Sequence, residues 1–129
     1  RLEAAAVDRA RRLLDLVGLG AKADAAAGSL SYGQRKLLAF AGALMPDPDL
    51  LLLDEPAAAV NPTMINQMKD HILALHREGK TVLLVEHNMD VVMDISQRIV
   101  VLDHGQKIAE GPPATIRRDP RVIEAYFGR

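Results

Sequence analysis

Two adjacent carboxylates, Asp54 and Glu55, follow the all-leucine run Leu50–Leu53. A short apolar run bounded by prolines predicts a strand that is buried on both faces, as in a parallel sheet. Ligands of parallel sheets bind at the carboxyl ends of the strands, where both acids lie. Placing two carboxylates beside a buried strand costs free energy unless a cation lies close to them. A Mg²⁺ ion held by Asp54 would supply one, and Glu55 could then polarise a water for attack on a phosphoryl group. The alternative is a surface turn in which both acids are solvated.

A second candidate is the segment Leu30–Gln34, which directly precedes a stretch of helical periodicity. Ser31 is a good N-cap, and the free N–H groups at a helix start favour an anion. Gly33 permits the close approach of a phosphate. Capping of a purely structural helix explains the same residues, so this segment by itself leaves both interpretations open.

A third candidate is His87, which follows the β-branched apolar run Thr81–Val85. We expect it at the same sheet edge as Asp54, where it could donate a hydrogen bond to a terminal phosphate. The alternative is a histidine that caps the next helix or faces water. The other histidines, at 71, 76 and 104, are interpreted as surface residues.

Hydrophobic periodicity predicts the elements that must position these side chains. The order strand, helix, strand, helix, strand predicts an α/β fold with a mostly parallel sheet and flanking helices. Strands are expected at 50–54, 81–85, 98–102 and 106–109. Helices are expected at 2–17, at 31–45, after Asn61, from Asn88 to Ile95, and from Pro112 and Pro120.

The composition narrows the class of protein. Hydrophobic residues make up 49% and charged residues 26%, which is typical of a globular domain. A net charge of -1 argues against nucleic acid as a partner held by phosphate contacts. Without any Cys, disulfides and thiolate metal sites are excluded. No apolar run approaches the roughly 20 residues that a membrane helix needs.

The order and spacing of the three candidates resemble the ABC ATPase family over nearly the whole chain. Leu30–Gln34 is similar to the LSGGQ signature motif, Leu50–Glu55 to the Walker B strand, Ala58–Asn61 to the D-loop, and His87 to the switch histidine. The resemblance implies a P-loop NTPase-type α/β fold. Residues 1–45 would then be the end of the helical signature subdomain, and 46–129 the C-terminal part of the ATPase core.

The family's roles carry over by position. The resemblance implies that Asp54 associates with Mg²⁺, that Glu55 is the general base, and that His87 senses the γ-phosphate of ATP. ATP and Mg²⁺ are therefore the expected cofactors. Asn61 stands where the D-loop more commonly has Asp, and Tyr32 where the signature more commonly has Gly.

The resemblance also implies partners. Two ATPase subunits of this family pair head to tail, so Ser31, Gly33 and Gln34 would contact the ATP bound by the partner subunit. Transmembrane permease subunits are expected as further partners, with a periplasmic or extracellular solute-binding protein acting indirectly. The expected location is the cytoplasmic face of the cell membrane, as a peripheral protein.

The sequence contains no G-x-x-x-x-G-K-[ST] string, so the Walker A loop and its strand are missing. Because the chain opens at Arg1 in a helical pattern, we expect further sequence upstream. The intact protein is expected to be an ABC-type ATPase, and the chain alone to be inactive and marginally folded. Without the Walker A strand, we expect the strand at 81–85 to pair with that at 50–54 and not with that at 98–102.

Three segments, 54–62, 86–93 and 119–128, resemble the ATPase subunits of branched-chain amino-acid importers. The expected function is ATP-driven import of a small solute, with branched-chain amino acids as the substrate. Two alternatives remain open. One is a non-transport ABC ATPase acting on ribosomes or DNA, although no basic arm or long coiled coil is visible. The other is a non-catalytic relic that lacks Walker A.

Overall fold

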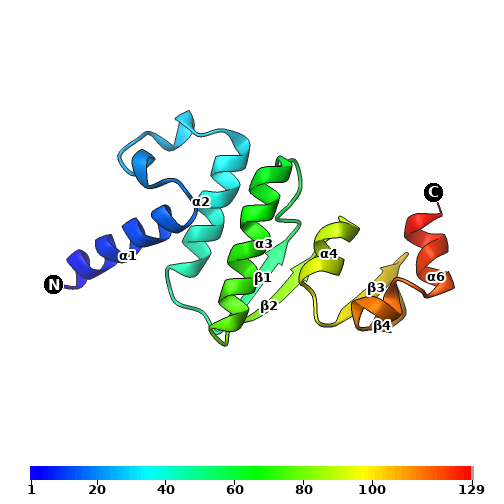
Figure 1. Ribbon diagram of the computed structural model, residues 1–129. Coiled ribbons are helices and arrows are strands. Elements are labelled where there is room, and N and C mark those ends of the chain that lie inside the picture. The colour runs from blue at the N-terminus through cyan, green and yellow to red at the C-terminus, as the bar shows by residue number, and fades with distance from the viewer. Residues whose placement is uncertain (129) are drawn as a thin grey trace. The chain divides into compact units, whose positions relative to one another are not determined.

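The four predicted strands form in the computed structural model, which describes residues 1–128. Helices lie before, between and after the strands (Figure 1), and most boundaries agree with the predicted ones within two residues. The strands are β1 (Leu50–Asp54), β2 (Thr81–Val85), β3 (Ile99–Asp103) and β4 (Gln106–Gly111). The helices are α1 (Leu2–Leu16), α2 (Tyr32–Leu44), α3 (Pro62–Arg77), α4 (Met89–Ile95), α5 (Pro113–Ile116) and α6 (Pro120–Val122), with a π-helical turn at Ile123–Phe127.

The chain divides into two compact units, Arg1–His87 and Asn88–Arg129. The first unit holds α1 to α3 with β1 and β2, and the second holds the remaining elements. The predicted division at residue 45, between a helical subdomain and an ATPase core, falls inside the first unit and stays a prediction.

The sheet of the first unit confirms the predicted pairing. β1 and β2 run parallel, in a register that joins Leu50 to Thr81 and Asp54 to Val85. β3 pairs with β4 and not with β2. Because Asp54 and Val85 are level with each other, the residues that follow both strands leave the sheet at the same edge.

Burial of β1 differs from the prediction, which was wrong in expecting both faces to be covered. Leu51 is only 5% exposed, whereas Leu52, on the opposite face, is 65% exposed. Leu83 of β2 stands beside Leu52 and is exposed as well. Side chains alternate between the two faces of a strand, and α3 packs against this sheet. Within the first unit, the face that carries Leu52 is left exposed.

Polar contacts join the end of α2 to the starts of β1 and β2. The Arg9 guanidinium donates to the carbonyl oxygens of Leu44 and Met45, both at 2.8 Å, at the C-terminal end of α2, where backbone acceptors lack helical partners. Asp47, which has a left-handed φ of 55°, accepts from Lys80 at 2.8 Å and lies 3.5 Å from Arg9. The hydrogen bond from Lys80 and the charges of both cations lower the pKa of Asp47.

The second unit is built on the antiparallel hairpin of β3 and β4. His104 and Gly105 both have positive φ, which suits a tight turn between twisted strands. Alternate residues of the hairpin are buried together with one residue of α4 and one each of α5 and α6. This core consists of Val92, Ile99, Val101, Ala109, Ile116 and Val122.

Glu110 of β4 forms ion pairs with Lys107 and Arg98. Hydrogen bonds from Lys107 and Arg98 and their positive charges lower the pKa of Glu110 from 4.5 to about 2. A carboxyl whose pKa is lower in the folded state stabilises the fold above its unfolded pKa and loses that contribution as the pH falls. We therefore expect Glu110→Gln to flatten the pH dependence of stability between pH 4.5 and 2.

The measurement is the thermal midpoint of the protein at intervals across that pH range, with the exposed Glu124→Gln as the matched control. Equal slopes in both variants would contradict the expectation.

None of the helices in residues 1–128 is both long enough and apolar enough to cross a membrane.

Candidate functional site

Glu55 and His87 meet at the carboxyl edge of the parallel strand pair. His87 Nδ1 lies 3.3 Å from Glu55 Oε1, although 32 residues separate them. The ends of β1 and β2 are level with each other, and this brings the two residues close, because Glu55 directly follows β1 and His87 lies two residues after the end of β2. The prediction that His87 lies at the same sheet edge as the two acids is confirmed. Both side chains remain accessible to solvent, so a substrate can reach them.

The backbone of Glu55 is held in an unusual conformation. Its φ is 46°, in the left-handed region that a residue with a Cβ rarely adopts. Its N–H donates to the Val85 carbonyl at 2.8 Å, and its own carbonyl accepts from Ala58 N–H at 3.2 Å and from Lys36 Nζ at 2.7 Å. Such a conformation persists when several contacts determine it together. Sequence reasoning missed Lys36, because nothing in the local pattern links it to Glu55.

Glu86 shapes the loops at this edge. One carboxylate oxygen accepts from Ala57 N–H at 2.8 Å, and the other accepts from His87 N–H at 3.0 Å. The side chain thus joins the turn after β1 to the segment after β2. This arrangement fixes the separation of the two loops that carry Glu55 and His87.

Asp54 ends β1 as an exposed carboxylate. Within the described part of the chain, no group of three or more His, Cys, Asp or Glu side chains could hold a metal ion. Mg²⁺ in phosphate-processing sites is held by one or two carboxylates, with waters and substrate phosphates completing its octahedron. A single accessible carboxylate at the sheet edge fits that kind of site. The Mg²⁺ role of Asp54 stays a prediction.

The segment before α2 forms a capping box. Ser31 Oγ accepts from Gln34 N–H at 3.2 Å, and Gln34 Oε1 accepts from Ser31 N–H at 3.0 Å. Ser31 and Gln34 therefore cap α2 reciprocally, which agrees with the interpretation of this segment as the cap of a structural helix. Their contact with the ATP of a partner subunit stays a prediction.

Gly33 is buried, and the space beside its Cα is filled by α3. A methyl carbon added at Gly33 would lie 2.9 Å from Met64 Sδ. A larger residue here would displace the Met64 side chain, so glycine suits the close approach of α2 to α3, a packing role that the sequence analysis did not predict. Its predicted contact with a phosphate is untested by this packing.

Asn61 caps the predicted helix α3, because its Oδ1 accepts from Met64 N–H at 2.9 Å. Met64 thus contacts both the cap of α3 and Gly33 at the start of α2. The structure brings the predicted D-loop and signature residues to neighbouring helix starts, while the Glu55–His87 pair lies at the sheet edge. The role of Asn61 in a nucleotide site remains a prediction.

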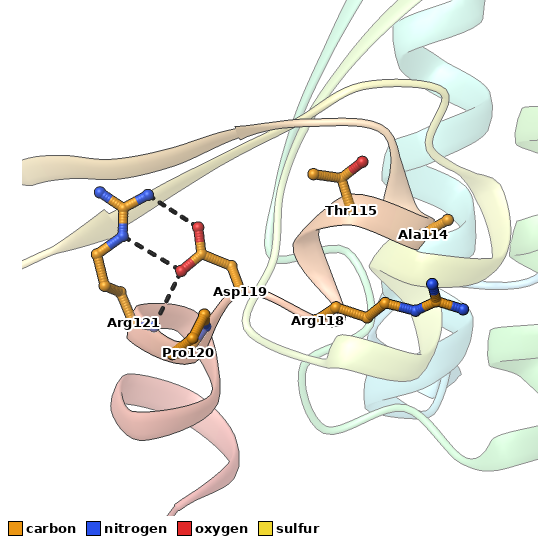
Figure 2. Close-up of a pocket in the computed structure, with 6 residues that line it drawn as sticks. All are labelled: Ala114, Thr115, Arg118, Asp119, Pro120 and Arg121. Atoms are coloured by element: carbon orange, nitrogen blue, oxygen red, sulfur yellow. Dashed lines mark hydrogen bonds and ion pairs between the residues drawn. The ribbon is translucent and has the colours of Figure 1, made fainter.

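A shallow hollow of about 590 Å³ in the second unit contains none of the predicted site residues (Figure 2). Asp119 in this hollow accepts from the Arg121 guanidinium at 2.8 and 3.2 Å and from Arg121 N–H at 2.9 Å. These bonds from Arg121 lower the pKa of Asp119. Arg118 extends away from that pair (Figure 2). The charged groups of the pair are already engaged with each other, so the hollow is not the candidate site.

Two family models match the chain. The model described as ABC transporter matches residues 2–58, which include the signature segment and the Asp54–Glu55 pair. The model described as branched-chain amino acid ATP-binding cassette transporter matches residues 106–129. The first match covers the N-terminal part of the sequence and the second covers the C-terminal part.

Characterised relatives match almost the full chain. BraF of Pseudomonas aeruginosa, a high-affinity branched-chain amino acid transport ATP-binding protein, is 44% identical in an alignment that covers 99% of this chain and 51% of BraF. LivG of Escherichia coli strain K12, named for the same transport role, is 40% identical with the same coverage. The chain therefore spans about half the length of the curated relatives that it matches.

Solved structures agree with the fold. A crystal structure of an ATP-binding cassette of an ABC transporter in its ADP conformation is 36% identical, with a TM-score of 0.84 over 97% of this chain and 51% of that one. A nucleotide-free ATP-binding cassette is 35% identical, with a TM-score of 0.85 and the same coverage. The α/β fold of the P-loop NTPase type is confirmed.

Proposed function

The chain belongs to the family of ABC transporter ATP-binding domains, and from this premise we propose that it forms the hydrolytic half of one ATP site and the signature half of another. The observation that supports this proposal most strongly is the pair of Glu55 and His87 at the carboxyl edge of two parallel strands, with Glu55 Oε1 3.3 Å from His87 Nδ1. Ligands of open α/β sheets bind at that edge. The proposed activity of the whole protein is ATP hydrolysis that drives solute import.

In the proposed reaction, Glu55 accepts a proton from the water that attacks the γ-phosphorus, and the bond between γ-phosphorus and the β,γ-bridging oxygen breaks. Asp54 would hold Mg²⁺, which neutralises charge on the phosphates when bound. The contact to His87 Nδ1 restrains the Glu55 carboxylate. The protein's task in this chemistry is chiefly to position these groups.

The tautomer of His87 limits what its other nitrogen can do. A neutral ring whose proton sits on Nδ1, facing Glu55, presents only an acceptor at Nε2. Donation from Nε2 to a phosphate oxygen therefore needs the imidazolium, or else a break of the contact with Glu55. The proposed phosphate-sensing role therefore links the position of the proton on His87 to whether the Glu55 carboxylate keeps its contact with the ring.

The proposed partners follow from the family. Ser31, Gly33 and Gln34 would contact the ATP of a second subunit in a head-to-tail dimer. Permease subunits would carry the solute, and a solute-binding protein would deliver it, with this chain at the cytoplasmic face of the membrane. Names of relatives at 40–44% identity support branched-chain amino acids as the solute. The solute would bind to those other subunits.

A chimera tests this function. Residues 1–129 replace the matching half of BraF, so that the BraF remainder supplies the phosphate-binding loop; we call this protein the BraF chimera. We expect it to hydrolyse ATP and to restore leucine uptake in cells that lack BraF. The control is the same chimera with Glu55→Gln, which should express equally and fail in both assays.

The two readouts separate two failures. A folded chimera without ATP turnover would contradict the ATPase proposal. A chimera that hydrolyses ATP but restores no leucine uptake with the BraF permease partners would contradict the proposed pairing of this chain with the permease of a branched-chain amino acid transporter.

A further inference from the structure

We infer that Lys36 is a positioning residue for Glu55, and that it connects the N-terminal half of α2 to the hydrolytic carboxylate of the same chain. The inference rests on the proposed role of Glu55 as general base. No motif noted in the sequence contains Lys36, which lies just after the segment Leu30–Gln34.

The contact that carries the inference is short and well defined. Lys36 Nζ lies 2.7 Å from the Glu55 carbonyl oxygen, across a sequence separation of 19 residues. The same ammonium lies 5.8 Å from the centroid of the Tyr32 ring, one helical turn earlier on α2. A cation within about 6 Å of an aromatic face is attracted by the ring. Tyr32 therefore favours the rotamer in which Lys36 reaches Glu55.

Glu55 needs such support, because its backbone is in the left-handed region with a φ of 46°. Each of its polar groups is engaged by a different part of the first unit. Its N–H donates to Val85 of β2, its carboxylate meets His87, and its carbonyl accepts from Lys36 of α2. The Lys36 contact is the one that connects this residue to the helical part of the unit.

Loss of the ammonium would loosen Glu55 without leaving its carbonyl unsatisfied, since Ala58 N–H also donates to that oxygen. The turn after β1 should therefore persist, while the Glu55 carboxylate should become less well oriented. A displacement of about 1 Å in a catalytic group can lower the rate about 10²-fold. The effect expected for Lys36 is smaller, because the contacts of Glu55 with Val85, Ala58 and His87 remain.

Through Lys36, the start of α2 is also connected to Glu55. Ser31 to Gln34 form the start of α2, and Lys36 lies in the same first turns of that helix. Any movement of the helix start therefore shifts the ammonium that contacts Glu55. By this route the signature half-site is coupled to the base of the other half-site carried by the same chain.

The test measures ATP hydrolysis by the BraF chimera with Lys36→Met and Lys36→Arg. We expect Lys36→Met to lower kcat about tenfold with KM for ATP unchanged, since one charge-assisted hydrogen bond corresponds to about that factor. Lys36→Arg should retain most of kcat, because a guanidinium also donates to a carbonyl. The matched control is Lys80→Met, which removes a lysine bonded to Asp47, before the start of β1, and should leave kcat unchanged.

A second measurement places Lys36→Met in the Glu55→Gln background, where it should lower the residual rate no further. An unchanged kcat for Lys36→Met, an equal loss in Lys80→Met, or a tenfold loss that persists without the Glu55 carboxylate would each overturn the inference. If Glu55→Gln itself left turnover unchanged, the proposed function would fail instead. The two failures are therefore distinguishable.

Discussion

Glu55→Gln in the BraF chimera is expected to lower ATP turnover by about 10²–10⁴-fold, the range that general-base catalysis contributes. The amide is nearly the same size as the carboxylate, but it cannot accept the proton of the attacking water. It can still accept a hydrogen bond from His87 Nδ1, which lies 3.3 Å from Glu55 Oε1 in the structure. ATP binding should therefore persist while hydrolysis stops, and the ATP-bound dimer should accumulate.

The measurement combines phosphate release with size-exclusion chromatography in the presence of ATP. Glu78→Gln, an exposed change beyond the end of α3, is the matched control and should behave like the parent protein. Normal turnover together with the absence of an ATP-bound dimer would show that Glu55 is not the base.

The second large effect concerns the core of the second unit. Ile116→Ala should destabilise that unit by about 2–5 kcal/mol, the range for truncating a fully buried aliphatic side chain to alanine. Ile116 is only 1% exposed and packs in a cluster that includes Val101 and Val122. The cluster includes alternate residues of β3 and β4, so a cavity there should weaken the hairpin directly.

Hydrogen exchange of peptides from β3 and β4 in the BraF chimera measures this local stability. The control is Ile123→Ala, the same truncation at a residue that is 42% exposed, which should change the exchange far less. Equal deprotection in both variants would mean that burial at Ile116 does not govern the hairpin.

The element order and the helix caps could be predicted because both depend on neighbours in the sequence. The Ser31 and Gln34 cap bonds span three residues, as does the Asn61 bond to Met64 N–H. Such contacts form whenever the helix forms, whatever packs around it. The parallel pairing of β1 with β2 was predictable as well, since their connection through α3 is a right-sized crossover for parallel strands.

Burial could not be predicted in the same way. The leucine run of β1 indicated two covered faces, yet Leu52 is 65% exposed in residues 1–128. An apolar pattern records that a side chain favours burial, whereas the burial itself depends on which other elements lie against the strand. The prediction that residues 50–54 form a strand was therefore confirmed, whereas the prediction that both faces of this strand are buried was wrong.

The sequence by itself determined that Asp54, Glu55 and His87, the residues proposed to carry the chemistry, lie at the ends of strands, because each follows an apolar run that forms a strand. Only the tertiary structure decided their geometry. The Glu55–His87 contact spans 32 residues and the Lys36–Glu55 contact spans 19. Contacts of that range depend on how helices and strands pack, which no local propensity specifies. For the same reason, the packing of Gly33 against Met64 became visible only where α2 and α3 meet.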